Sequence, residues 1–411
     1  MTNKGWKIYK IDNICEVLSS KRIFAADYVK FGIPFYRSKE IIEKAFGENI
    51  SNLLYIAEEK YNDIKSKYGV PKENDILISA VGERSGIPYL VRNEEFYFKD
   101  GNLIWIRNFD DRKIFSKYLC YWFKSKIGQF TLENLMIGSA QKALTIVGIK
   151  GIELNLPPLE VQNKIAKVLS ALDNKIELNN AINNNLEQQA QAIFKSWFVD
   201  KENKNRKTCK AEEYFDISIG KTPPRKEPQW FTHQNSDTKW VSIADMGNCG
   251  VYICDTSEYL LPEAISKFNV CLVPKDTVIL SFKLTVGRIA ITNEMMTTNE
   301  AIAHFKTNNK TINEYLYLYL KNFNFKTMGS TSSIATAVNS KIIKAMPFII
   351  PTNEELSIFH KITNPIFKQI KANQLESKNL TQLRDALLPK LMSGEIDVEN
   401  IDISTDKLSF S

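Results

Sequence analysis

The 411-residue chain is poor in the residues that build metal and redox sites. It has six cysteines and three histidines, and no Cys-x-x-Cys pair, so we expect reduced structural thiols and no zinc site. It also lacks a run of about 18 apolar residues, and its first ten residues lack the apolar core of a signal peptide. These absences predict a cytoplasmic protein that makes no contact with a membrane.

Complete catalytic signatures are missing as well. Gly220-Lys221-Thr222 resembles the end of a phosphate-binding loop, but the required upstream glycine is replaced by Phe215. Asn364-Pro365-Ile366-Phe367 departs from the Asn-Pro-Pro-Phe motif of adenine methyltransferases at its third residue. No Gly-x-Ser-x-Gly or His-Glu-x-x-His motif is present. We therefore predict that this chain has no catalytic residue and binds neither a metal nor a cofactor.

What the chain does contain is a long internal repeat. Three blocks recur in the same order in its two halves: ENDILISA (73–80) and KDTVILSF (275–282), YLCYWFKS (118–125) and YLYLYLKN (315–322), GSAQKALT (138–145) and GSTSSIAT (329–336). The first pair is typical of a buried strand, the second of a helix with one apolar face, and the third of a loop. A repeat of this length indicates a duplicated domain and not a solenoid unit.

Each copy ends in a long amphipathic pattern that predicts a helix, over residues 159–197 and 353–391, roughly 58 Å each. The apolar seam steps by seven residues with Asn in third place: Ile165, Leu172, Asn179, Leu186 and Ile193, then Phe359, Ile366, Asn373, Leu380 and Leu387. Strongly polar outer faces favour helices that pair with each other. Since each helix leads from one half toward the other, we expect an antiparallel pair with Asn179 and Asn373 near its midpoint. The alternative is that each helix packs on its own half and its asparagine faces solvent.

These patterns predict an α+β protein. We expect two similar globular α/β domains separated by two long antiparallel coiled-coil helices, in a circular arrangement with a pseudo-two-fold axis. The expected segments are a first domain (1–157), a first spacer helix with linker (158–205), a second domain (206–351), and a second spacer helix with the C-terminal tail (352–411).

Basic residues gather in the predicted loops of a chain whose net charge is +7. Lys and Arg next to Ser, Thr and Gly can approach phosphates and base edges closely, which favours nucleic-acid binding. Ordinary solvated turns are the alternative. The candidate DNA-binding residues are Lys21, Arg22, Arg37, Lys39, Arg84, Ser139, Gln141 and Lys142 in the first half, and Lys221, Arg225, Lys283, Arg288, Ser330 and Ser332 in the second.

The two spacer patterns carry a family resemblance. PPLEVQNKIAKVLSALDNKI (157–176) and LRDALLPKLMSGEIDV (383–398) resemble the specificity subunit of type I restriction-modification systems. GIPFYRSKEI (32–41), and SIGKTPPR (218–225) with KWVSIADM (239–246), are similar to the openings of two groups of target recognition domains in that family. The resemblance covers essentially the whole chain.

This resemblance implies a division of labour. Each target recognition domain would read one half of a bipartite, asymmetric site in double-stranded DNA, and the helices would set the spacer and dock two modification subunits. Those subunits, and restriction subunits where present, would bind S-adenosylmethionine, ATP and Mg²⁺. Two other functions stay open: a coiled-coil scaffold without DNA specificity, and a single-chain restriction or modification enzyme.

Overall fold

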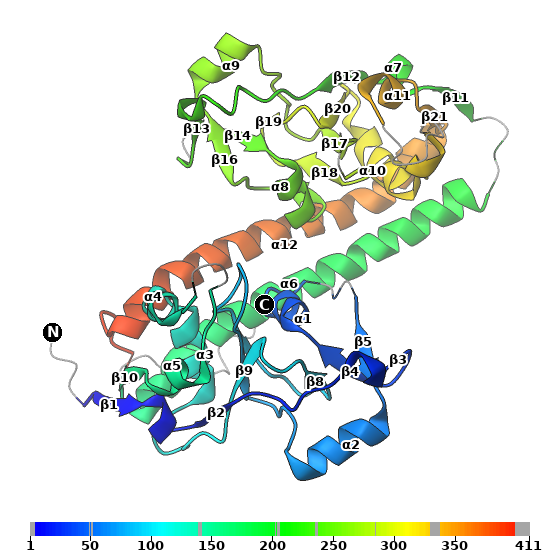
Figure 1. Ribbon diagram of the computed structural model, residues 1–411. Helices are drawn as coiled ribbons and strands as arrows, with labels where there is room; N and C mark the ends of the chain where they lie inside the picture. The colour runs from blue at the N-terminus through cyan, green and yellow to red at the C-terminus, as the bar shows by residue number, and fades with distance from the viewer. Residues whose placement is uncertain are drawn as a thin grey trace. The chain divides into compact units, whose positions relative to one another are not determined.

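The computed structural model describes residues 5–48, 50, 52–138, 142–201, 203, 206–234, 237–283, 285–328 and 338–398. The chain forms two compact units, one of Met1–Glu177 with Leu380–Ser411 and the other of Leu178–Asn379. Figure 1 shows both divisions falling inside long helices, α6 (Leu159–Phe194) and α12 (Asn353–Ser393). Each unit is therefore built from one globular part and a segment of both helices.

The first unit contains two four-stranded sheets and a two-stranded ribbon. One sheet has the order β2-β9-β6-β7, the other β3-β5-β4-β8, and β1 pairs with β10 just before α6 begins. Its strands are β1 (Lys7–Lys10), β2 (Glu16–Leu18), β3 (Tyr28–Val29), β4 (Ile33–Tyr36), β5 (Leu54–Ile56), β6 (Ile76–Ser79), β7 (Pro88–Leu90), β8 (Tyr97–Phe98), β9 (Leu103–Arg107) and β10 (Glu153–Leu156). Its shorter helices are α1 (Ser38–Ala45), α2 (Glu58–Lys67), α3 (Ser116–Lys124), α4 (Lys126–Leu135) and α5 (Ile146–Lys150).

The second unit repeats this frame with one additional edge strand. Its sheets have the orders β12-β20-β17-β18-β15 and β13-β16-β14-β19, and β11 pairs with β21 just before α12. Its strands are β11 (Lys207–Lys210), β12 (Asp216–Ile219), β13 (Phe231–Thr232), β14 (Thr238–Val241), β15 (Tyr252–Ile253), β16 (Glu258–Leu260), β17 (Val278–Ser281), β18 (Ile289–Thr292), β19 (Thr297–Thr298), β20 (Ile302–Lys306) and β21 (Pro347–Ile350). Its shorter helices are α7 (Ala211–Tyr214), α8 (Ile243–Asn248), α9 (Pro262–Phe268), α10 (Asn313–Asn322) and α11 (Ser340–Lys344).

The first two repeated blocks of the sequence occupy equivalent elements in the two units, whereas residues 329–336, the second copy of the third block, lie outside the described residues. The first block forms β6 and β17, which are buried along their whole length because each lies between two other strands of its sheet. The second forms α3 and α10, whose buried faces carry Tyr118 and Leu119, and Tyr315 and Leu316. The predicted α+β architecture, with two similar domains and two long helices, is confirmed.

Each long helix contributes to the cores of both units. In the first unit, Ile165 and Leu169 of α6 share a hydrophobic core with Leu391 of α12. In the second, Phe194 lies 6.3 Å from the ring of Phe359. Burial against the globular parts explains why the compact units divide within the helices and not at their ends.

Candidate nucleic-acid interface

The first basic loop of the first unit lies beside β8. The main-chain N–H of Lys21 donates to the Tyr97 hydroxyl at 2.7 Å, and the Lys21 ammonium lies 4.7 Å from the centre of the Tyr68 ring. Arg22 Nε donates to Asp100 at 2.9 Å, although the arginine side chain is 67% exposed. The structure therefore anchors this loop and presents both cations at the surface.

Arg37 is a capping residue as well as a surface cation. It precedes α1, and its main-chain N–H and guanidinium both donate to Glu40. Burial would raise the pKa of Glu40, but the hydrogen bonds from Arg37 outweigh it and lower that pKa. Lys39, one residue into the helix, is exposed and pairs loosely with Glu43 at 3.7 Å.

In the second unit, the equivalent capping position is held by a serine. Ser242 precedes α8 and shares a reciprocal capping box with Asp245, with N–H to oxygen distances of 2.8 and 3.1 Å. The two domains thus carry different side chains at the same place in a shared frame.

A second candidate surface is the tip of the β6–β7 hairpin. Arg84 is exposed there, 4.8 Å from the centre of the Phe46 ring. The hairpin contacts the end of the block 138–145, because Leu144 N–H donates to Ala80 O at 2.8 Å. Lys142, in the same block, lines an open cavity of about 1030 Å³ together with Glu83 and other residues near the hairpin.

Lys221 is the middle residue of the Gly220-Lys221-Thr222 segment that resembles a phosphate-binding loop, but the local geometry serves a different purpose. Its N–H donates to Thr298 O at 2.9 Å. A Cβ added at Gly220 would lie 2.1 Å from Asn299 O, so only glycine fits this close passage beside β19. Lys221 itself is exposed.

Arg225 is held by both charge and aromatic contact. Its guanidinium makes a bidentate pair with Glu258 at 2.7 and 2.9 Å, and its centre lies 4.0 Å from the Phe231 ring and 4.5 Å from the Trp240 ring. The hydrogen bond from Arg225, with its charge, lowers the pKa of Glu258. Because Phe231, Trp240 and Glu258 lie on β13, β14 and β16, Arg225 connects three strands of one sheet.

The two candidates on the β17–β18 hairpin differ in their exposure. Lys283 is exposed at the turn, whereas Arg288 is half-buried and donates from Nη1 to Ile243 O at 2.6 Å. A Cβ at Gly247 would lie 2.5 Å from that guanidinium. Arg288 therefore links the hairpin to α8. Four further candidates lie outside the described residues: Ser139, Gln141, Ser330 and Ser332.

In the part of the chain that the structure describes, the candidates of each unit come from more than one loop. Lys21, Arg22 and Arg37 accompany the β4–β8 end of one sheet, whereas Arg84 and Lys142 accompany the hairpin of the other. Lys221 and Arg225 belong to the loop after β12, and this loop is equivalent to the one after β2 that holds Lys21 and Arg22. Basic loops thus lie at matching positions of the two domains.

The helix seam follows the predicted seven-residue steps only in part. Ile165, Asn179, Phe359 and Asn373 are buried, but the other predicted positions are half-buried: Leu172, Leu186, Ile193, Ile366, Leu380 and Leu387. Their neighbours Leu169, Ala190, Phe194, Phe367, Ile370 and Leu388 are buried in their place. A strict seven-residue row drifts by about 20° per step around a straight helix, so it leaves the buried face within a few turns.

Asn179 and Asn373 lie next to each other within the second unit. Asn179 Nδ2 is 3.5 Å from Asn373 O and donates to Glu376 at 2.8 Å. Asn373 Nδ2 donates to Asn183 Oδ1 at 2.8 Å, and Asn183 Nδ2 lies 3.3 Å from Ile370 O. Along α6 from Asn179 to Asn183, the contacted residue on α12 moves back from Glu376 to Ile370, so the helices run antiparallel here.

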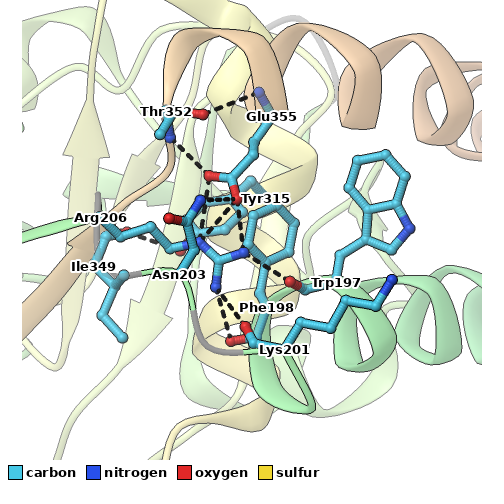
Figure 2. A network of polar contacts seen from close by, with 9 residues as sticks. All are labelled: Trp197, Phe198, Lys201, Asn203, Arg206, Tyr315, Ile349, Thr352 and Glu355. Atoms are coloured by element: carbon cyan, nitrogen blue, oxygen red, sulfur yellow. Dashed lines mark hydrogen bonds and ion pairs between the residues drawn. The ribbon is translucent and has the colours of Figure 1, made fainter.

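Sequence reasoning missed the residue that fastens the linker. Figure 2 shows Arg206 between the end of α6 and the start of α12, donating to Glu355 at 2.8 Å and to the carbonyl oxygens of Trp197 and Lys201. Burial would raise the pKa of Glu355, but hydrogen bonds, first from Arg206 and then from Asn203, lower it to about 2. Arg206 directly follows the predicted linker, and only the three-dimensional structure places it over helix carbonyls.

A second missed contact joins α12 to the added edge strand. The Gln374 side chain accepts from Tyr252 N–H and donates to Tyr252 O, both at 3.0 Å, so it replaces a neighbouring strand. Lys371 and Lys378 flank it and pair with Asp276 and Asp255 at 3.2 and 3.1 Å. Their spacing on one helix face was a detectable signal for a contact surface.

Known proteins share this repeated organisation. The family model described as type I restriction modification DNA specificity domain matches residues 3–188 and 203–384. Over 329 residues the chain is 27% identical to the Type I restriction enzyme HindI specificity subunit of Haemophilus influenzae, covering 62% of this chain and 71% of that protein. Over 427 residues it is 23% identical to the putative type I restriction enzyme MjaX specificity subunit of Methanocaldococcus jannaschii, covering 96% and 95%.

A solved structure shares the fold. The crystal structure of a type I restriction-modification S subunit from M. genitalium aligns with a TM-score of 0.58 at 17% identity, covering 95% of this chain and 97% of that chain. In the part of this chain that the structure describes, no helix is long and apolar enough to cross a membrane. With both halves matched by the family model, the chain belongs to the type I restriction-modification DNA specificity domain family and is a specificity subunit with two such domains.

Proposed function

We propose that each domain reads one half of a bipartite, asymmetric DNA site, and that α6 and α12 fix the number of base pairs between the halves. The observation that carries this proposal is a repeated frame with different side chains at its loops. Arg37 and Ser242 cap equivalent helices, and the loops after β2 and β12 are both basic but differ in sequence. A shared frame supports equivalent docking on DNA, and different loops support different half-sites.

The length of the helices suits a spacer. α6 has 36 residues, which is about 54 Å at 1.5 Å per residue. Half-sites one turn apart on the same face of DNA are about 34 Å apart. Helices of this length are sufficient to connect two domains that bind successive turns.

In this proposal the chain itself is not catalytic. Its partners are double-stranded DNA and two modification subunits that dock on the helices, with restriction subunits joining in a complete system. S-adenosylmethionine, ATP and Mg²⁺ are bound by those partner subunits. The chain determines the DNA site at which those subunits act.

The test is an exchange of one domain within the complete modification complex. Residues 1–157 are replaced by the corresponding domain of a relative, and the methylated sequences are mapped in cells that express the complex. We expect one half of the site to change, while the other half and the spacer stay the same. Changes in both halves would refute independent reading, and the absence of salt-sensitive DNA binding by the chain with its partner subunits would favour a scaffold without specificity.

A further inference from the structure

The arginines of this chain are almost all committed to contacts within the protein. The sequence has ten, and nine have a guanidinium that donates to a carboxylate or carbonyl. The pairs are Arg22–Asp100, Arg37–Glu40, Arg92–Glu177, Arg107–Glu16, Arg112–Asp110, Arg206–Glu355, Arg225–Glu258 and Arg384–Asp173, with Arg288 bonded to the Ile243 carbonyl. Among the described residues, the Arg84 guanidinium alone has neither a hydrogen bond nor an ion pair.

The position of Arg84 is nevertheless well defined. Its carbonyl accepts the Ser79 hydroxyl at 2.8 Å, which fixes the main chain at the hairpin tip. Two residues further, Gly86 has a φ of +88° and its N–H donates to Ser79 O at 2.7 Å, which closes the turn. The guanidinium then rests 4.8 Å from the centre of Phe46, a ring that is 55% exposed.

An arginine stacked on an aromatic ring keeps its donors free at its edge. Cation–π contact uses the flat face of the guanidinium and leaves its N–H fork in the plane. That fork matches the O6 and N7 acceptors of guanine in the major groove. The Arg84 guanidinium is therefore available to a guanine, because its contact with Phe46 does not use its hydrogen-bond donors.

The surroundings of Arg84 favour a base edge over a phosphate. Glu83 is the adjacent residue, and it lines the neighbouring cavity together with Glu133 and Lys142. Two carboxylates repel the phosphate backbone, whereas they accept hydrogen bonds from exocyclic amino groups such as cytosine N4.

We propose that Arg84 reads a guanine in the half-site of the first domain and that Phe46 is the residue that positions it. This proposal rests on the proposed function, since it assigns one base pair within the half-site. Arg37 and Arg288, by contrast, act through the helix ends and hairpin that they hold together.

The experiment compares variants in the complete complex of this chain with its modification subunits. Random double-stranded DNA is selected for binding and sequenced, for the wild type, Arg84→Lys, Phe46→Leu and Phe46→Tyr. For Arg84→Lys we expect the preference for one G·C pair to fall from about tenfold or more to within about threefold, with every other position unchanged. Phe46→Leu should weaken the preference at the same base pair, whereas Phe46→Tyr, which keeps an aromatic ring, should retain it.

The control is Arg112→Lys, an exposed arginine paired with Asp110, which should leave the selected motif unchanged. Thermal melting of each variant shows that the chain remains folded. A motif that keeps every position, with equal loss of affinity for all sequences, would show a phosphate contact and overturn the inference. A wild-type complex that selects no bipartite motif would instead refute the proposed function.

Discussion

Ser79 and Ser281 occupy the same position in two hairpins and make the same pair of hydrogen bonds. Ser79 Oγ accepts from Ile87 N–H at 2.9 Å and donates to Arg84 O, while Ser281 Oγ accepts from Arg288 N–H at 3.0 Å and donates to Thr285 O. Both serines are fully buried. The duplicated domain has thus kept a side chain that bridges its hairpin internally while the residues at the tip have diverged.

Replacing either serine by alanine should destabilise its unit. Ser79→Ala leaves a main-chain N–H and a carbonyl without their partner, which costs about 1–3 kcal/mol in the free energy of unfolding. Denaturant unfolding measures this loss, with Ser66→Ala as the control, because the Ser66 hydroxyl bonds only an exposed helix carbonyl. Equal stability of the Ser79 variant and the control would contradict the bridging role.

Gly220→Ala should destabilise the second unit through overpacking. The new Cβ would lie 2.0 Å from Thr298 Oγ1 and 2.1 Å from Asn299 O, far inside van der Waals contact. The strand must therefore shift, at a cost of about 1–3 kcal/mol. The melting temperature reports the effect. A Gly220→Ala variant as stable as the wild type would show that the passage beside β19 is not as close as described.

The Arg206–Glu355 pair should make the free energy of unfolding depend on pH in the acidic range. The folded pKa of Glu355 is lowered from its ordinary 4.5 to about 2, so its contribution is complete above about pH 5 and is lost as the pH falls toward 2. A shift of this size corresponds to about 3 kcal/mol, and both side chains are largely buried.

Unfolding free energies of the wild type and Glu355→Gln, measured between pH 2 and 7, test this prediction. The difference between the two proteins should be large at pH 7 and shrink below pH 4. Glu354→Gln, at the exposed neighbouring position, is the matched control. A difference that does not vary with pH would rule out the pair as its cause.

Replacing both Asn179 and Asn373 by leucine should raise the free energy of unfolding and allow α6 and α12 to pair in more than one register. Their partners Glu376 and Gln369 are exposed and can turn to water, and the half-buried Asn183 keeps its contact with Ile370 O. Apolar packing therefore gains more than the lost hydrogen bonds. Without polar groups at this layer, shifted pairings of the helices are no longer penalised.

Two measurements check the asparagine prediction. Melting should occur at a higher temperature than in the wild type, and mapped methylation should show a mixture of half-site spacings. Asn185→Leu, at an exposed position of the same helix, should change neither. A more stable double variant with one unchanged spacing would remove the asparagines from the control of register.

The sequence was sufficient for the duplicated frame, because buried strands and long helices leave strong periodic patterns. β6 and β17 are continuous apolar runs, and the long helices begin at the predicted residues. The helix seam was less accurate, because only its first and third layers are buried. Burial on a helix depends on which neighbour is present and not on spacing alone.

Individual site residues were harder to predict, because an arginine has the same sequence signature whether it reads a base or holds a fold. Arg37, Arg225 and Arg288 looked like Arg84, but their acceptors are distant in the chain or hidden in a helix end. Gln374 offered no local signal that its amide would pair with the main chain of Tyr252.

The division of the compact units inside α6 and α12 has a consequence for how the protein unfolds. Helix formation is cooperative along a continuous segment, and each helix supplies buried side chains to both cores. Loss of one core therefore frays the helices on which the other depends. Calorimetry should show a single heat-absorption peak for this chain, where two domains joined by a loose linker would give two.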